Sequence, residues 1–152
     1  MPLSLTSPAF DDGEPIPREY GYTERNVSPP LAVAGVPEAA VSLALLVDDP
    51  DAVAPAGKVW DHWVVWNVDP ATTAIPEGWD PAASGAVEGR NDYGGRGYGG
   101  PNPPDREHTY RFELYALGTT LDLPRDSTAD DVRTAAEGSV LERATLTGTY
   151  AP

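Results

Sequence analysis

The amino-acid sequence predicts a mostly β protein, a sandwich of antiparallel strands with one helix near the C-terminus. Three observations predict this fold. The apolar segments are short and are separated by turn residues, with 15 Gly and 17 Pro in 152 residues, as in sandwiches of short strands. Residues 59–68 are apolar on both parities, and residues 110–117 alternate between apolar and polar side chains. Only residues 128–143 show a helical spacing.

Six main strands are expected, at residues 3–7, 31–33, 41–48, 59–68, 110–117 and 145–150. The strand at 59–68 is apolar on both faces, which is typical of an interior strand, so we place it centrally in its sheet. In the strand at 110–117, Tyr110, Phe112 and Leu114 share one parity, and polar or charged residues stand between them. This pattern predicts a strand with one buried face.

Residues 128–143 are expected to form one helix packed on the sandwich. A Ser-Thr pair precedes two aspartates there, the pattern of an N-cap followed by acids in the first turn. Val132, Ala136 and Val140 then recur at every fourth position, as on one helix face. No linker divides the sequence, so we expect a single domain over residues 1–152.

The charge is strongly acidic. Asp and Glu number 24 against 10 Lys and Arg, for a net charge of −14, and Lys58 is the only lysine. Such a surface repels nucleic acids and anionic lipids, so we expect no nucleic-acid partner. It also repels itself, and salt at about 1 M screens that repulsion because the Debye length falls to about 3 Å. We therefore interpret the chain as halophilic, adapted to a salty cytoplasm.

The sequence shows no sign of export or membrane insertion. Its longest aliphatic run covers residues 43–47, far below the roughly 20 residues that span a bilayer. Residues 1–10 lack the pattern of a signal peptide, and a cytoplasmic location is expected. With no cysteine in the chain, a disulfide, a thiolate zinc site and a cysteine nucleophile are excluded.

A glycine-rich segment at residues 85–104 holds seven glycines and three prolines. Such a composition is often a flexible loop. Here Tyr93 and Tyr98 are interleaved with arginine, asparagine and aspartate. These residue types predict a loop anchored by packing and hydrogen bonds.

Few residues are equipped for chemistry. The only histidines are His62, inside the apolar strand at 59–68, and His108, just before the strand at 110–117. Asp48, Asp49 and Asp51 cluster around a proline that fixes the backbone between the last two. Taken separately, a histidine on an apolar strand is usually a buried structural residue, and three acids in four residues are usually an exposed turn. Asp48 is open to that second interpretation.

Several short motifs, taken together and in order, resemble a known family. They are Asp49-Pro50-Asp51-Ala52, then Trp60 with His62, then Gly100-Pro101 with His108 and Tyr110. These segments are similar to the two signature regions of the phosphatidylethanolamine-binding protein family, also called Raf-kinase-inhibitor-like. The likeness runs from residue 7 to residue 150, and the compact length resembles bacterial and archaeal members.

The resemblance implies two antiparallel sheets with a pocket at one end that binds phosphate-like anions, including phospholipid head groups. The site residues that it implies are Asp49, Asp51, Trp60, His62, Gly100, His108 and Tyr110. A phosphate accepts hydrogen bonds from phenol, imidazolium and backbone N–H groups, and Gly100 would let the backbone approach it closely. The two carboxylates would accept hydrogen bonds from the imidazoles and hold them protonated.

Three positions depart from the family pattern. Val53 stands where a proline is usual, Asn102 replaces a cysteine or proline, and Thr109 replaces the arginine that follows the second histidine. Arg111 has the same parity as Thr109 on the strand. These departures bear on the affinity for an anion more than on the fold.

Three functional classes follow from these observations. The first, which we favour, is a binder of a small phosphate-type anion or phospholipid head group, with or without a regulatory protein partner. The second is a kinase- or protease-inhibitor-like interaction module whose pocket is structural. The third, a metal-dependent hydrolase, lacks a close-spaced histidine pair and a Gly-x-Ser-x-Gly motif. We expect no catalytic residue, no metal and no cofactor; the natural ligand, the partner and a homodimer stay open.

Overall fold

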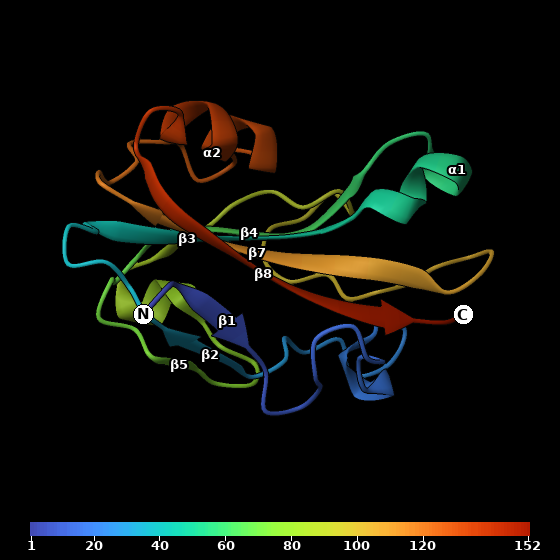
Figure 1. Ribbon diagram of the computed structural model, residues 1–152. Helices are drawn as coiled ribbons and strands as arrows, with labels where there is room; N and C mark the ends of the chain where they lie inside the picture. The colour runs from blue at the N-terminus through green and yellow to red at the C-terminus, as the bar shows by residue number, and fades with distance from the viewer.

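Two antiparallel sheets frame the computed structural model, which describes residues 1–152 (Figure 1). The larger sheet has the strand order β6-β4-β3-β7-β8 and the smaller sheet the order β1-β2-β5. The strands are β1 Ser4–Thr6, β2 Leu31–Ala34, β3 Ser42–Asp49, β4 Trp60–Val68, β5 Ala74–Ile75, β6 Val87–Glu88, β7 His108–Leu117 and β8 Val140–Tyr150. The predicted sandwich of two antiparallel sheets is confirmed.

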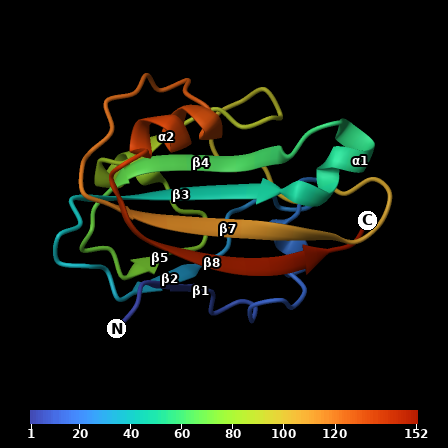
Figure 2. The same cartoon turned by 45° about the horizontal axis from the view of Figure 1, so that its top comes forward.

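The helices are short. They are α1 Val53–Ala56, α2 Ala129–Ala136 and three 3-10 helices at Arg18–Tyr20, Pro50–Ala52 and Pro81–Ser84. Figures 1 and 2 show α1 and α2 near opposite ends of the larger sheet, on the side away from the smaller sheet. No helix combines the length and the apolar character that a bilayer crossing requires.

Strand β3 is the centre of the molecule, and all eight of its residues are buried. Leu43 and Leu45 belong to the core between the two sheets, where they join Trp63 and Phe112. Leu46, of the opposite parity, belongs to a second apolar cluster that includes residues of α2. Because successive side chains of a strand point to opposite faces, β3 contributes to the apolar clusters on both sides of the larger sheet. The aliphatic run at 43–47 is what makes this burial possible.

Strand β4, which we placed centrally, is interior but is not the middle strand. It lies between β3 and the two-residue strand β6. Trp63 and Trp66 fill opposite faces and are fully buried. The apolar residues on both parities therefore predicted correctly that β4 is an interior strand. The prediction that it is the central strand was wrong, because β3 holds that place.

The predicted helix at 128–143 is too long. Its beginning is right, because the Thr128 hydroxyl caps the backbone N–H of Asp131 and α2 starts at residue 129. The helix ends at residue 136, and Gly138 then takes a left-handed φ of 80°, which favours glycine. Val140 opens strand β8 and is 45% exposed, so it does not continue the buried helix face.

Candidate functional site

Three strand ends meet at one end of the larger sheet. β3 ends at Asp49, β4 begins at Trp60 and β7 begins at His108. Because β3 pairs antiparallel with both neighbours, its last residues lie beside the first residues of β4 and β7. This topology explains how residues far apart in the sequence come to share one site.

A pocket of about 280 Å³ opens among these strand ends. Of the seven predicted site residues, five line it: Asp49, Trp60, His62, His108 and Tyr110. Asp51 and Gly100 do not line it. We call this the inner pocket; contact between these residues and a ligand stays a prediction.

Asp49 is held by protein groups on both of its oxygens. Its Oδ1 accepts the backbone N–H of Asp51 at 2.9 Å, which caps the 3-10 helix Pro50–Ala52. Its Oδ2 lies 2.6 Å from Nδ1 of His108. The carboxylate is buried, so its function here is to orient His108.

Asp51 connects the end of β3 to the beginning of β7. Its Oδ2 accepts the backbone N–H of Thr109 at 2.9 Å, and Nη2 of Arg106 lies 3.7 Å from its Oδ1. We expected an imidazole as its donor, and the structure corrects this. Arg106 supplies a cation near this carboxylate, whereas Arg111 bonds to Asp48 instead and does not line the pocket.

His108 is clamped between two carboxylates. Nδ1 faces Asp49, and Nε2 lies 2.7 Å from Oδ1 of Asp105. Burial lowers the pKa of this imidazole, but the hydrogen bonds to Asp49 and Asp105 outweigh that effect and raise it above the ordinary value. His108 can donate to both carboxylates at once only as the imidazolium, and the raised pKa favours that form.

His62 differs from His108. Its Nδ1 donates to the carbonyl oxygen of Gly99 at 2.7 Å. Burial lowers its pKa, and the hydrogen bond to Gly99 offsets this only in part. The expectation that both histidines are protonated is therefore corrected: a carbonyl cannot compensate an imidazolium as a carboxylate does. Neutral His62 keeps its lone pair on Nε2.

Two buried donors of the inner pocket have no partner. They are the indole Nε1 of Trp60 and the phenolic oxygen of Tyr110; the latter makes no well-formed hydrogen bond, although Asp49 and the backbone of Asn102 lie near enough to influence its pKa. Tyr110 packs edge-on against His62, with ring centroids 5.2 Å apart. Buried polar groups are nearly always hydrogen-bonded, and each exception costs about 1–3 kcal/mol. Two exceptions in one pocket wall indicate a place for an acceptor.

Gly100 has a different role from the expected one. Its N–H donates to the side chain of Asn26 at 2.8 Å, and a Cβ on it would lie 2.1 Å from the carbonyl oxygen of Tyr20. Glycine is required for this close approach of two backbone segments. The predicted anchoring of the loop is confirmed: Tyr93 donates to the carbonyl of Gly100 at 2.8 Å, and Tyr98 to that of Tyr20 at 2.9 Å.

Sequence reasoning did not assign a role at the site to Tyr93, Asp105 or Arg106. Tyr93 lines the pocket, and Asp105 and Arg106 belong to the loop that precedes β7. Asp105 stands three residues before His108 in the sequence. No signal distinguished it from the other 23 acidic residues of the chain.

Comparisons with known proteins agree with this architecture. The family model for phosphatidylethanolamine-binding protein matches residues 6–151. A protein of Methanothermobacter thermautotrophicus named UPF0098 protein is 46% identical over 97% of this chain and 98% of its own length. A relative in Mycobacterium tuberculosis is named as a lipoprotein, with 40% identity over 98% of this chain and 72% of its own length.

Two crystal structures are closely similar. One, described as a phosphatidylethanolamine-binding protein homolog from Chlamydia trachomatis, superposes with a TM-score of 0.90 and 38% identity over 98% of this chain and 97% of its own. The other is Escherichia coli YbcL, with a TM-score of 0.89 and 32% identity over 99% and 98% of the two chains. The match over nearly the whole chain includes every strand that builds the pocket.

Proposed function

The chain belongs to the phosphatidylethanolamine-binding protein family, and from that premise we propose that its inner pocket binds a phosphate-type anion. Membership supports a ligand-binding or regulatory role in general. The residues of the pocket support the narrower statement. A cytoplasmic location stays a prediction, since one relative is named as a lipoprotein.

The observation that carries the proposal is the pair of unpartnered donors, Trp60 Nε1 and Tyr110 Oη. An indole nitrogen can only donate, so a ligand that satisfies it must present an acceptor. Phosphate oxygens accept several hydrogen bonds at once. Neutral His62 fits the same ligand, because its Nε2 can accept a hydrogen bond from the P–OH group of a phosphate monoanion.

Asp105 determines how such an anion would enter. Its carboxylate occupies Nε2 of His108, and its side chain is 39% exposed. A phosphate oxygen that took this place would exchange one negative partner of His108 for another. The buried charge would then change little, and Asp105 would return to solvent. Asp105 therefore acts in this proposal as an internal competitor of the ligand.

The size and the lining of the pocket also favour a small bound group. A volume of about 280 Å³ lies just below the range of about 300–1,000 Å³ that is usual for ligand sites. A head group fits such a space, and a whole lipid does not. No serine, threonine or cysteine nucleophile lines it.

The test is a calorimetric titration of inorganic phosphate at constant chloride and ionic strength. Tyr110→Phe removes the hydroxyl and keeps the ring, and Trp60→Phe replaces the indole by a smaller aromatic ring without an N–H. Each should weaken binding about tenfold, as loss of a hydrogen bond to a charged group does. Trp66→Phe is the matched control, because Trp66 Nε1 is also buried without a partner but packs in the cluster with α2. Unchanged affinity in both pocket variants would reject the proposal.

Two further titrations separate the sources of the phosphate group. Phosphoethanolamine in solution and short-chain phosphatidylethanolamine below its micelle concentration carry the same phosphate chemistry as inorganic phosphate. A head-group site predicts tighter binding of both than of inorganic phosphate. Tightest binding of inorganic phosphate would indicate a site for the free anion.

A further inference from the structure

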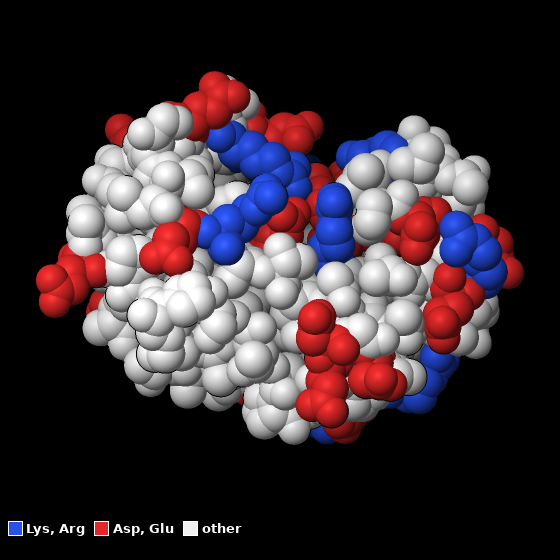
Figure 3. Space-filling model, viewed as in Figure 1, with Lys and Arg blue, Asp and Glu red and all other residues white.

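A second hollow lies on the outer face of the larger sheet, between α1 and α2. Its volume is about 580 Å³, twice that of the inner pocket. Four of the ten basic residues of the chain line it: Lys58, Arg111, Arg133 and Arg143. Figure 3 shows basic side chains gathered in a hollow of this face. We call this the outer groove.

The charge of the outer groove differs from that of the rest of the surface. Its lining holds four acidic and four basic side chains, so its formal charge is zero. The chain as a whole carries −14. An anion is therefore repelled less here than by the strongly acidic parts of the surface.

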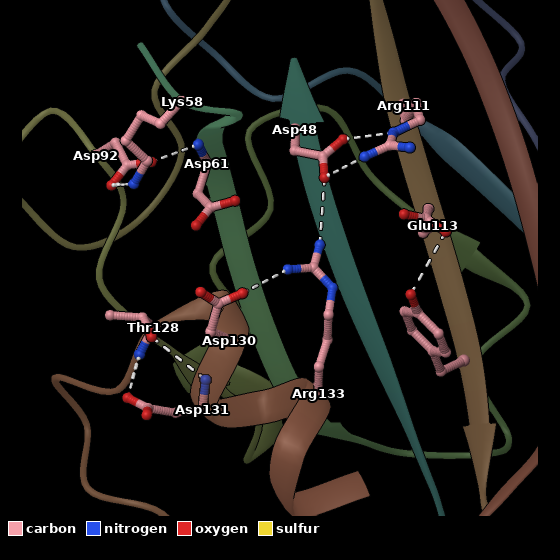
Figure 4. A network of polar contacts seen from close by, with 11 residues as sticks. Asp48, Lys58, Asp61, Asp92, Arg111, Glu113, Thr128, Asp130, Asp131 and Arg133 are labelled. Carbon is pink, nitrogen blue, oxygen red and sulfur yellow. Dashed lines mark hydrogen bonds and ion pairs between the residues drawn. The ribbon is translucent and has the colours of Figure 1, made fainter. Parts of the chain in front are cut away.

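Asp48 organises the groove. Its carboxylate is buried at 2% exposure. Arg111 donates to it from Nε at 2.8 Å and from Nη2 at 2.9 Å, and Arg133 donates from Nη2 at 3.2 Å (Figure 4). One carboxylate thus fixes two guanidinium groups. The trio has a charge of +1, and most of the five N–H bonds on each guanidinium remain unused by Asp48.

The two arginines are fixed without being enclosed. Their side chains are 38% and 36% exposed. Arg133 also donates from Nη1 to Asp130 at 3.1 Å, so it bridges two carboxylates and still keeps further N–H groups free. Arg143 adds a third guanidinium, 60% exposed and held only by a 3.7 Å ion pair with Glu113. Ligand sites are built from side chains held in place in this way with donors left free.

We propose that the outer groove binds a small molecule through a carboxylate or phosphate oxyanion, held by Arg111, Arg133 and Arg143. Guanidinium groups bind both kinds of oxyanion with paired hydrogen bonds. The volume of the groove falls in the range usual for small-molecule sites. This site is separate from the inner pocket, and its test does not depend on the function proposed for that pocket.

Asp61 differs from the other acidic residues of the groove, because its carboxylate has no bonded partner. No hydrogen bond or ion pair reaches its carboxylate, which is drawn in Figure 4 without a contact to any neighbour. Burial and the charge of Asp92 raise its pKa to about 6. The charged groups that act on it are Asp92, Arg133, Lys58 and Asp48, and Asp130 lines the same groove. Above about pH 6 the Asp61 carboxylate is negatively charged and opposes an incoming anion. Below about pH 6 it is protonated and neutral, and this opposition is removed.

The experiment titrates the intact protein with citrate and, separately, with inorganic phosphate, at fixed ionic strength. Calorimetry gives the affinity, and the arginine Nε–H signals in ¹⁵N NMR identify the site. Arg143→Gln should weaken binding in the groove at least about tenfold, because it removes a charged donor. Asp61→Asn should tighten binding several-fold at pH 7.5 and leave it unchanged at pH 5. A larger response to citrate would identify a polycarboxylate ligand, and a larger response to phosphate a phosphorylated one.

Arg25→Gln is the matched control, since Arg25 is 62% exposed, lies outside the groove and makes comparable ion pairs. It should leave the affinity unchanged. Equal weakening by Arg25→Gln and Arg143→Gln would mean that only net charge matters and would overturn the proposal. Arginine signals that move with neither anion would overturn it as well. Both exposed arginines lie outside the core, so neither result depends on a variant that fails to fold.

Discussion

The inner pocket and the outer groove are built from the same three strand ends, on opposite faces of one sheet. Three pairs of neighbouring residues are divided between them, the first of each pair lining the groove and the second the pocket: Asp48 and Asp49, Asp61 and His62, Arg111 and Tyr110. The alternation of β strands produces this division. The same three strands therefore supply residues to both the pocket and the groove.

The difference between the sites lies in how each satisfies its buried carboxylate. Asp49 is bonded by a backbone N–H and an imidazolium, both inside the fold. Asp48 is bonded by two guanidinium groups that also reach solvent. The free donors of the pocket are an uncharged indole and phenol, whereas those of the groove are charged. The pocket is therefore specified by hydrogen bonds and the groove by charge.

The largest effect that distinguishes the two sites is expected in stability. Asp49→Ala leaves a backbone N–H without an acceptor and the His108 imidazolium with one carboxylate, so it should lower the free energy of unfolding by about 3 kcal/mol. Asp48→Ala should cost less, about 2 kcal/mol, because water can solvate the released guanidinium groups. Urea unfolding at pH 7 measures both. A larger loss for Asp48→Ala would reverse the comparison.

The next effect concerns Asp105 as the internal competitor of the pocket. Asp105→Asn should raise phosphate affinity about tenfold, because His108 no longer holds a competing carboxylate. The variant should also lower the pKa of His108, measured by NMR. Asp122→Asn, at an exposed position in a loop away from the pocket, is the control. If Asp105→Asn weakened phosphate binding, Asp105 would be part of the binding site and not its competitor.

The two histidines predict opposite effects of pH on stability. The pKa of His108 is raised in the folded state, so its contribution is complete below about pH 6.5 and is lost as pH rises through the folded value. The pKa of His62 is lowered, so the folded state loses stability as pH falls below about 6.5. Compared with the wild type, His108→Asn should flatten the alkaline side of the stability profile and His62→Asn the acid side. Two profiles that change on the same side would contradict these assignments.

The smallest effect is expected from salt, which acts on the charge of the whole chain and not on a single residue. Because the charge is −14, potassium chloride between about 0.1 and 2 M should raise the thermal midpoint by screening repulsion. It should also weaken anion binding in the groove more steeply than in the pocket. Melting curves and titrations over this range test both statements. A midpoint that fell with chloride would reject the halophilic interpretation.

The sequence predicted those parts of the fold that depend on local pattern. The alternation at 110–117 and the aliphatic run at 43–47 gave two strands of the larger sheet, since burial of one or both faces is visible as periodicity. The end of α2 was missed because Val140 kept a helical spacing after Gly138 had turned the chain. A four-residue spacing cannot show that the backbone between has changed direction.

The sequence likewise predicted those parts of the site that depend on local motifs. Resemblance of motifs gave five residues that share one pocket, but not the partners of those residues. Asp48 looked like part of an exposed acidic turn, yet it is buried against Arg133, which is 85 positions away in the chain. The resemblance assigned Gly100 to the ligand, and the sequence could not show that this glycine lies against the carbonyl oxygen of Tyr20. Contacts of this range are set by the topology of the sheets and not by local pattern.

If an oxyanion satisfies the buried donors of the inner pocket, the indole N–H signal of Trp60 should report its binding directly. Phosphate should replace chloride at constant ionic strength and pH while the four tryptophan indole signals are followed by ¹⁵N NMR. We predict a saturable downfield shift of the Trp60 signal, with the dissociation constant found by calorimetry, and an unchanged Trp66 signal. A Trp60 signal that stays in place while calorimetry records phosphate binding would contradict the account.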